Sequence, residues 1–181
     1  MTGKAHTIHL ETERLFLREL TNGDLGSLHG ILSDPESMRH YPRPFTLAES
    51  ERWIQWNLEN YRTYGFGLWA VVRKEDGRFL GDCGLTMQSI GGQSLPEIGY
   101  HIDKAYTGNG YATEAARACR DYAFGVLRFP AVYSYMKYTN TASLRVAEKN
   151  GMRRVAELPD EKNGITLVYA ITHEEYLHLE D

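Results

Sequence analysis

The stretch that decides the fold begins Glu97-Ile-Gly-Tyr-His-Ile102 and continues through Asp103-Lys-Ala-Tyr-Thr-Gly-Asn-Gly110 into Tyr111-Ala-Thr-Glu-Ala-Ala-Arg117. The first six residues predict a strand, and the glycines that follow predict a loop. Small and apolar residues then recur at i, i+3, i+4 and i+7, which predicts an amphipathic helix. They are Ala112, Ala115, Ala116, Cys119, Tyr122, Ala123 and Val126. Small side chains at the start of a helix let it press closely against a sheet.

The glycine-rich turn between this strand and this helix predicts an anion site. Gly108 and Gly110 free the backbone N–H groups to converge, and a helix N-terminus adds about half a positive charge. A pyrophosphate suits such a site, and a simple tight turn is the alternative interpretation. Two better-known phosphate motifs, GxxxxGK[ST] and GxGxxG, are absent from the sequence.

The rest of the chain alternates predicted strands and helices. Leu25, Leu28 and Leu32 indicate a helix, and Thr46-x-x-Glu49 fits a capping box that starts a second one. The remaining segments add strands at 14–20, 68–72, 79–87, 132–138 and 167–171, a helix at 141–150 and an Asn163-Gly164 hairpin turn. A Gly/Ser loop is expected between 87 and 97. This order predicts an α/β or α+β domain of three layers around a mixed sheet.

Composition limits the function classes. The chain has 181 residues and a net charge of −4, so neither length nor charge suggests a second large domain or a nucleic-acid partner. The N-terminus lacks the apolar stretch of a signal peptide, and no segment resembles a membrane span. We expect a cytoplasmic protein without membrane association. Its two cysteines, Cys83 and Cys119, form no C-x-x-C pair and are expected to be buried thiols, and no metal site is expected.

Three ordered blocks resemble the GNAT acetyltransferases. Thr107-Gly-Asn-Gly110-Tyr-Ala112 is similar to the family's acetyl-CoA motif [Q/R]-x-x-G-x-[G/A], with Thr107 in place of Gln or Arg. Asn140-Thr-Ala-Ser143-Leu-Arg-Val-Ala-Glu-Lys-Asn-Gly151-Met resembles the N-x-x-S-x-x-x-x-E-K-x-G signature of the RimJ/RimL-type branch, and Glu97-Ile-Gly-Tyr100 is the third block. Arg14-Leu-x-Leu-Arg18 is a weaker match. The resemblance covers about 13–176, which leaves a loosely held lead-in at 1–12 and a tail at 177–181.

The resemblance implies a three-layer fold with a mostly antiparallel sheet of about seven strands, flanked by helices. It also implies transfer of an acetyl group from acetyl-CoA to a primary amine, by direct attack in a ternary complex. The positions that would contact acetyl-CoA are Ile98, Gly99, Tyr100, His101, Ile102, Thr107, Gly108, Asn109, Gly110, Tyr111, Ala112, Thr113, Asn140 and Ser143. Tyr41, Pro42 and Phe45, between the first two helices, are expected to contact the acceptor.

The chemistry requires a base for the amine, N–H donors for the oxyanion and a proton for the leaving thiolate. Glu97 is the candidate base, acting directly or through water, with Asp82, His101 and Glu114 as rivals. Ser143 is the candidate acid, with Tyr138 as the alternative. Asn140 suits both an amide contact with the cofactor and a helix N-cap. Gly99 suits either a bulge where strands part or close packing.

The acceptor stays open at this stage. A protein N-terminal α-amine fits the RimJ/RimL resemblance, and a small-molecule amine is the alternative. A degenerate domain that senses acyl-CoA is a third interpretation, which the joint presence of Glu97, Asn140 and Ser143 disfavours. Either a monomer or a homodimer is compatible with the sequence.

Overall fold

One mixed sheet of eight strands organises the protein, and the computed structural model describes residues 7–179. The strand order is β1-β2-β3-β4-β5-β6-β8-β7. The strands are β1 (Ile8–Glu11), β2 (Leu15–Glu19), β3 (Leu68–Arg73), β4 (Phe79–Ile90), β5 (Gln93–Ile102), β6 (Ala131–Lys137), β7 (Arg153–Asp160) and β8 (Gly164–Thr172). The helices are α1 (Leu25–Leu32), α2 (Leu47–Tyr64), α3 (Tyr111–Gly125), α4 (Thr141–Lys149) and α5 (His173–Leu177).

Strands β5 and β6 form the parallel pair in this sheet, and the other neighbours are antiparallel. Their ladder consists of one residue pair, Glu97 with Tyr133. The buried Ser134 hydroxyl donates to the Ile98 carbonyl oxygen at 2.8 Å, and beyond this point the two strands separate. A sheet that is mixed and mostly antiparallel is therefore confirmed, with an opening in its middle.

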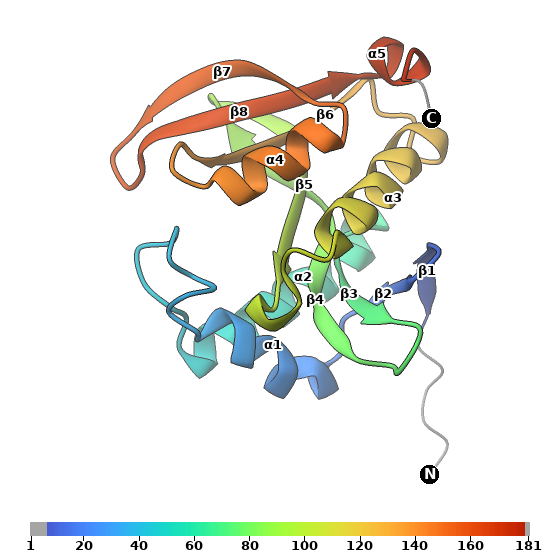
Figure 1. Cartoon of the computed structure of the whole chain (residues 1–181), viewed down its shortest axis with the longest axis vertical. Coiled ribbons are helices and arrows are strands. Elements are labelled where there is room, and N and C mark those ends of the chain that lie inside the picture. Colours follow the sequence, from blue (N-terminus) through green and yellow to red (C-terminus); the bar gives the residue numbers. More distant parts are fainter. Residues whose placement is uncertain (1–6, 180–181) are drawn as a thin grey trace.

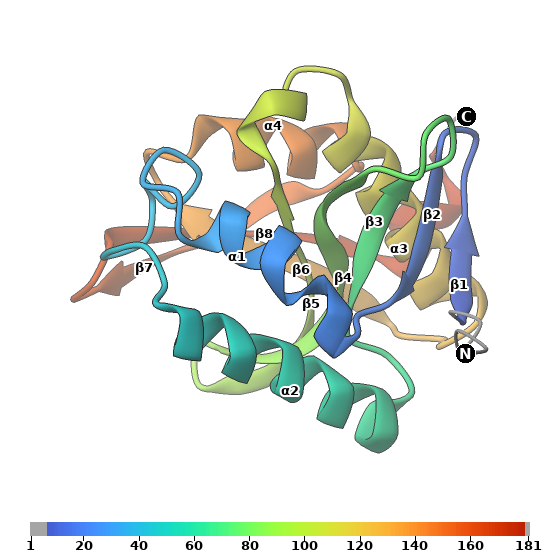
Figure 2. The same cartoon turned by 90° about the horizontal axis from the view of Figure 1, so that it is seen from below.

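Helices cover both faces of the sheet, as Figures 1 and 2 show. Trp69 belongs to the larger core cluster, which includes the α3 residues Ala115, Ala116 and Cys119. Its neighbour Ala70 points the other way and joins Leu28 and Ile54 of the α1 and α2 side in the second cluster. Because successive strand residues face opposite sides, the two clusters are the two sides of one sheet. The three-layer prediction is confirmed.

The predicted helix boundaries are confirmed where capping residues signalled them. The Thr46 hydroxyl accepts from the Glu49 N–H, and the Glu49 carboxylate accepts from the Thr46 N–H, so the capping box is complete. Gly151 closes α4 with a φ of 81°, a left-handed conformation that glycine adopts without strain. Its neighbour Met152 is buried. Cys83 and Cys119 are both fully buried free thiols, as expected.

Several expectations about the periphery are wrong. The lead-in at 1–12 contains β1, which pairs with β2 at the edge of the sheet; its residues 1–6 lie outside the described range. The loop expected between 87 and 97 shrinks to a Gly91-Gly92 turn, because β4 and β5 pair from Ile90 and Gln93 onward. The last hairpin is where it was predicted: the Asp160 carboxylate holds its turn at 161–163, and Gly164, with a φ of 75°, begins β8. Helix α5 was not predicted, and 180–181 of the tail lie outside the described range.

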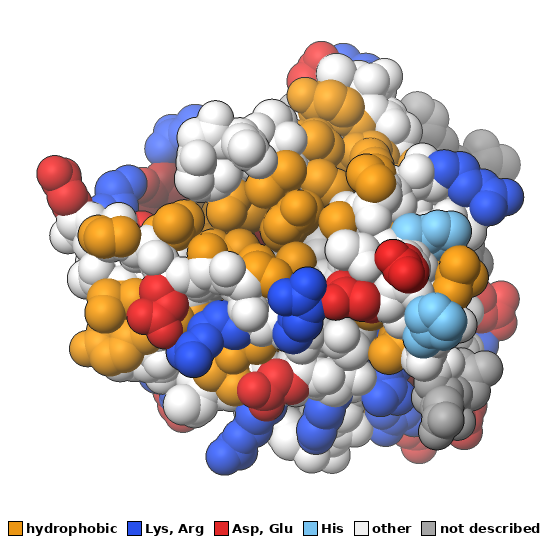
Figure 3. Space-filling view, turned by 90° about the horizontal axis from the view of Figure 1, so that it is seen from above, with side chains coloured by type: hydrophobic (Ala, Val, Ile, Leu, Met, Phe, Trp, Pro, Cys, Tyr) orange, Lys and Arg blue, Asp and Glu red, His pale blue; other side chains and the backbone are white. Residues whose placement is uncertain are grey.

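Hydrophobic side chains gather over the middle of the face seen in Figure 3, and charged side chains lie around them. Val155 on β7 and Ile165 on β8 are 43% and 41% exposed. The exposure of these two side chains does not decide between a monomer and a homodimer, and the oligomeric state stays a prediction. Within 7–179, no helix is both long and apolar enough to cross a membrane.

Candidate active site

The loop before α3 has the geometry of an anion cradle. Gly108 and Gly110 have φ values of 80° and 83°, and Gly110 is the N-cap of α3 without a side-chain hydrogen bond. The Thr107 hydroxyl donates to the Lys104 carbonyl and the Asn109 amide to the Tyr106 carbonyl, so both side chains are used inside the loop. The first N–H groups of the helix have no intrahelical partner. A phosphate site at these N–H groups stays a prediction.

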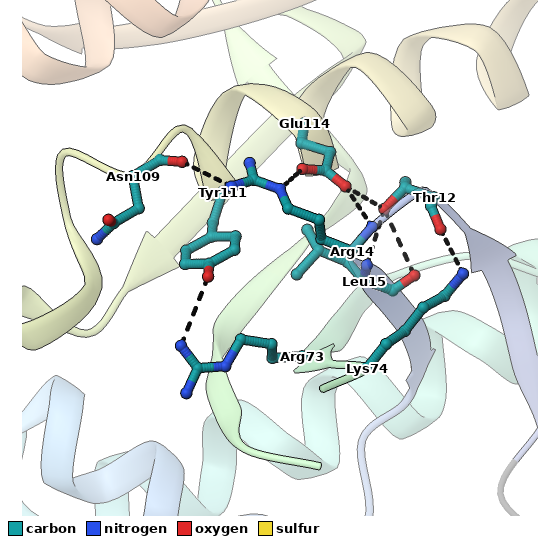
Figure 4. Close-up of polar contacts among 8 residues, drawn as sticks. All are labelled: Thr12, Arg14, Leu15, Arg73, Lys74, Asn109, Tyr111 and Glu114. Carbon is teal, nitrogen blue, oxygen red and sulfur yellow. Dashed lines mark hydrogen bonds and ion pairs between the residues drawn. The ribbon is translucent and has the colours of Figure 1, made fainter. Parts of the chain in front are cut away.

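Arg14 braces this cradle from the N-terminal side (Figure 4). Its Nη1 donates to the Asn109 carbonyl at 3.0 Å, its Nε donates to Glu114 at 2.6 Å, and its guanidinium lies 4.5 Å from the Tyr111 ring centroid. Burial opposes ionisation of Glu114, but hydrogen bonds from Thr12 and Arg14 lower its pKa. Glu114 is therefore a structural partner of Arg14, and its candidacy as a base is wrong. The Arg14-Leu-x-Leu-Arg18 pattern was the signal for this brace.

Glu97 is half-buried on β5, at the residue pair where β6 begins to diverge. Thr86 on β4 donates to its Oε2 at 3.3 Å. A Cβ on Gly99 would lie 2.9 Å from this same oxygen, so Gly99 leaves the space that the carboxylate fills. The β4–β5 register runs through Gly99 without a shift, so β5 has no bulge on its β4 side. Burial raises the pKa of Glu97 to about 7, against the opposing effects of Thr86 and His101.

Asp82, His101 and Tyr41 form a continuous chain of hydrogen bonds beside Glu97. The fully buried Asp82 carboxylate lies 2.8 Å from His101 Nδ1 and accepts from Trp53 Nε1 at 2.9 Å. His101 Nε2 lies 2.6 Å from the Tyr41 hydroxyl. Burial opposes the charge on His101, but the adjacent Asp82 raises its pKa above the ordinary value. These groups were predicted separately, and their connection was missed.

The segment between α1 and α2 thus lies against the same face of β5 as Glu97. Tyr41 makes an edge contact with Phe45 at 6.2 Å between ring centroids, and Phe45 packs on Trp53. Burial raises the pKa of Tyr41, and the charges of Asp82 and Glu97 raise it further. Tyr135 on β6 is exposed, and its pKa is raised to about 12 by burial of its hydroxyl and by Glu97. The hydroxyl groups of Tyr41 and Tyr135 therefore lie near the Glu97 carboxylate.

The other face of β5 leads to α4. The Tyr100 hydroxyl donates to the Ser143 carbonyl at 3.0 Å, so Tyr100 and His101 face opposite sides of the sheet. The Asn140 side chain accepts from the Ser143 N–H, which confirms its N-cap role. The Ser143 hydroxyl makes no hydrogen bond with any residue in 7–179. Tyr138 is 51% exposed, and its ring lies 4.0 Å from an ideal Cβ on Gly164, by the last hairpin.

Comparison with known proteins identifies the family. Residues 14–153 match the Acetyltransferase (GNAT) domain family. The chain belongs to the GNAT acetyltransferases. It is 42% identical over 144 residues to YkkB of Bacillus subtilis (strain 168), covering 79% of this chain and 84% of that protein. It is 30% identical over 201 residues to the FsC-acetyl coenzyme A-N(2)-transacetylase of Aspergillus fumigatus, covering 99% of this chain and 82% of that protein.

Solved GNAT structures share this fold. An acetyltransferase from Agrobacterium tumefaciens superposes with a TM-score of 0.79 at 28% identity, over 94% of this chain and 98% of that one. A spermidine N-acetyltransferase from Vibrio cholerae, in complex with CoA and spermine, gives 0.75 at 19% identity, over 92% and 100% of the two chains. RimL with CoA gives 0.73 at 15% identity, over 89% and 95%, which supports the fold alone.

The family membership makes this GNAT protein an acetyl-CoA-dependent N-acetyltransferase. Within 7–179, no group of three or more His, Cys, Asp or Glu side chains is arranged to hold a metal ion. The RimJ/RimL branch is not confirmed, because RimL is only a distant structural neighbour.

Proposed function

We propose that the protein acetylates a primary amine by direct attack on acetyl-CoA in a ternary complex, with Glu97 as the base. The observation that carries this proposal is the half-buried Glu97 carboxylate with a pKa of about 7, at the opening between β5 and β6. A general base works best when its pKa is near the operating pH. At pH 8 this carboxylate is ionised and still basic enough to take a proton from an ammonium, directly or through one water.

The cradle and the diverging strand would hold acetyl-CoA. Backbone N–H groups from Gly108 to Thr113 suit the pyrophosphate, because a helix N-terminus favours negative charge. The main chain of 98–102 suits the pantetheine arm and the oxyanion, where β6 has moved away from β5. Asn140 suits an amide of that arm in addition to its capping role. The Ser143 hydroxyl suits the leaving sulfur, and Tyr138 is the alternative.

A protein N-terminal α-amine is the acceptor that we favour. An α-amine has a pKa of about 7.7–8.0, whereas a lysine side chain has about 10.4. A base with a pKa of about 7 is close to the first value and more than three units from the second. The Asn140 and Ser143 block, which resembles the RimJ/RimL type, supports the same acceptor.

A small-molecule amine is the second candidate. The transacetylase of Aspergillus fumigatus aligns over nearly the whole chain, and the structural relative from Vibrio cholerae is a spermidine N-acetyltransferase. Neither relationship extends to the identity of the acceptor in this protein. The exposed Tyr41 and Tyr135 near Glu97 suit either a peptide N-terminus or a small cation.

A thiol-release assay with three acceptors of different chemistry would test this proposal. The acceptors are an Ala-Ala dipeptide amide, Nα-acetyl-lysine amide and spermidine. We expect the dipeptide amide to give a kcat/KM at least about tenfold above the others at pH 7.5. A preference for spermidine would replace the α-amine by a small polyamine. Acetyl-CoA binding without thiol release from any acceptor would favour an acyl-CoA sensor.

A further inference from the structure

Two protons must leave the acceptor nitrogen during acetyl transfer. A primary ammonium carries three N–H bonds, and the amide product carries one. The sulfur of CoA takes up one proton, so one proton is released overall. Glu97 can hold one of the two protons that leave the nitrogen. The remaining proton can pass to a second acceptor on the amine side of the thioester.

The hydrogen-bond chain beside Glu97 has the composition of such an acceptor. Asp82 receives the His101 backbone N–H at 3.1 Å and the Trp53 indole N–H at 2.9 Å, besides facing His101 Nδ1 at 2.8 Å. A carboxylate opposite Nδ1 keeps a proton on that nitrogen, which leaves Nε2 of the neutral ring as an acceptor. The Tyr41 hydroxyl, 2.6 Å from Nε2, then donates to it.

The hydrogen-bonded side chains Asp82, His101 and Tyr41 are positioned to meet an acceptor amine. Glu97 and His101 lie on one face of β5, separated by Gly99, whose missing side chain brings the Glu97 carboxylate along the strand. His101 is 11% exposed at its side chain and Asp82 is inaccessible, whereas Tyr41 is 40% exposed. Tyr41 is therefore the member of the chain that an acceptor can touch. The other side chains next to the Asp82–His101–Tyr41 chain are Glu97, Tyr135 and Trp53.

We propose that Tyr41, His101 and Asp82 form a second proton acceptor, which takes a proton from the acceptor nitrogen as the new C–N bond forms. This proposal rests on the proposed function. Tyr41 is the catalytic residue of this proposal, because its hydroxyl would contact the amine, and His101 and Asp82 are positioning residues that act through it. The same arrangement of hydroxyl, imidazole and buried carboxylate raises the basicity of hydroxyl groups in enzymes with catalytic triads.

The step is balanced in atoms and charge. The amine N–H bond breaks, and its proton moves to the Tyr41 oxygen while the Tyr41 proton moves to His101 Nε2. Tyr41 stays neutral, His101 becomes an imidazolium, and Asp82 remains a carboxylate that stabilises it. The electron pair of the N–H bond stays on nitrogen, and the C–S bond breaks to release the thiolate. After the product leaves, the imidazolium returns its proton through Tyr41 to solvent.

Kinetics of Tyr41→Phe, His101→Gln and the double variant would test the proposal. We expect each single variant to lose about 10²-fold or more in kcat with an unchanged KM for acetyl-CoA, in the range for one acid–base group. The double variant should be no slower than the worse single variant, because members of one unit are not additive. Wild-type kcat should fall as pH decreases with two ionisations, Glu97 and His101, whereas His101→Gln should show only that of Glu97.

Ser50→Ala is the matched control. It removes another hydrogen bond of the same helical layer, between Ser50 and His29 at 2.9 Å, without touching β5. The control should lower the melting temperature and leave the pH profile unchanged. Tyr41→Phe with wild-type kcat, or with changes confined to amine KM and stability, would overturn the proton-acceptor role.

Imidazole ¹⁵N NMR of the wild-type protein provides a readout that needs no turnover. The neutral His101 ring should carry its proton on Nδ1, and a proton on Nε2 would overturn the proposal even if a variant fails to fold. A wild-type protein that binds acetyl-CoA but acetylates no amine overturns the proposed function and this inference together. An active wild type with unaffected Tyr41→Phe kinetics overturns only the inference.

Discussion

Replacing Glu97 by Gln is expected to raise stability and to lower activity. Its folded pKa of about 7 lies above the ordinary value of about 4.3 for a glutamate, so the folded state binds this proton more tightly than the unfolded state. The resulting stabilisation is present at low pH and is lost as pH rises through 7. At pH 8, Glu97→Gln should therefore melt at a higher temperature than the wild type, and the difference should shrink at pH 5.

The same substitution should lower kcat by roughly 10²-fold or more, in the range for a general base. The loss should be partly recovered above pH 9, where an α-amine deprotonates without help. Wild-type kcat/KM should fall as pH decreases through about 7, because the carboxylate must be ionised to act. An identical pH–rate profile in Glu97→Gln would assign deprotonation to water or to another group.

Ser143 and Asn140 lie one helical turn apart, and their alanine variants should lose different properties. Ser143→Ala removes a hydroxyl without a partner in the described part of the chain, so stability should change little. Its kcat and kcat/KM should fall together by about tenfold, the mark of an interaction made in the transition state. Asn140→Ala loses the N-cap, which costs about 1 kcal/mol, and should raise the KM for acetyl-CoA. A silent Ser143→Ala beside a slow Tyr138→Phe would move the acid role to Tyr138.

At the scale of elements, β4 depends on glycines that no pattern in the sequence explains. A Cβ on Gly84 would lie 2.0 Å from the Gly67 carbonyl oxygen and 2.7 Å from Leu68 Cα, and both neighbours are backbone. Gly84→Ala should therefore force β3 and β4 apart and cost about 2 kcal/mol or more in unfolding free energy. Gly30→Ala, in α1 with open space around its Cβ position, should instead stabilise by about 0.5–1 kcal/mol. Urea unfolding of both variants measures the difference.

The elements that the sequence predicted correctly are those with local signals. Thr46 and Glu49 predicted the start of α2, and Gly151 predicted the end of α4, because capping depends on residues close in the chain. The same signal was present for α5, since the side chain of Thr172 caps the Glu175 N–H, but it was overlooked beside the last strand. Strand β1 has four residues and lies at an edge, so its identity depends on pairing with β2 and not on its own pattern.

At the scale of the molecule, the glycine loop before α3 was predictable and the hydrogen-bond chain beside Glu97 was not. Gly108 and Gly110 lie next to the helix that they serve, so one segment contains the whole motif. The chain Asp82–His101–Tyr41 joins three segments that are up to 60 residues apart in the sequence, through distances that only the folded sheet sets. Arg14 likewise reaches Asn109 across 95 positions. Sequence could nominate these residues singly, but the fold determines which of them meet.

Binding of acetyl-CoA should stabilise the whole molecule, because the cradle connects α3 to the sheet core and to Arg14. A ligand at a hundred times its Kd adds about 2.7 kcal/mol to the unfolding free energy. For a chain of this size that corresponds to roughly 5–10 °C in Tm, at roughly 2–4 °C per kcal/mol. Gly110→Asp should abolish this shift, since it places a carboxylate at the helix N-terminus where the pyrophosphate would bind.

Gly92→Asp is the matched control for that experiment. Gly92 has a φ of 80°, close to the 83° of Gly110, and lies at the open β4–β5 turn, so the control reproduces the backbone strain and the added charge away from the cradle. Scanning calorimetry with and without CoA should give the full shift for Gly92→Asp and none for Gly110→Asp. Equal shifts in the two variants would mean that the phosphates bind elsewhere, because strain and charge are the same in both and only the position differs.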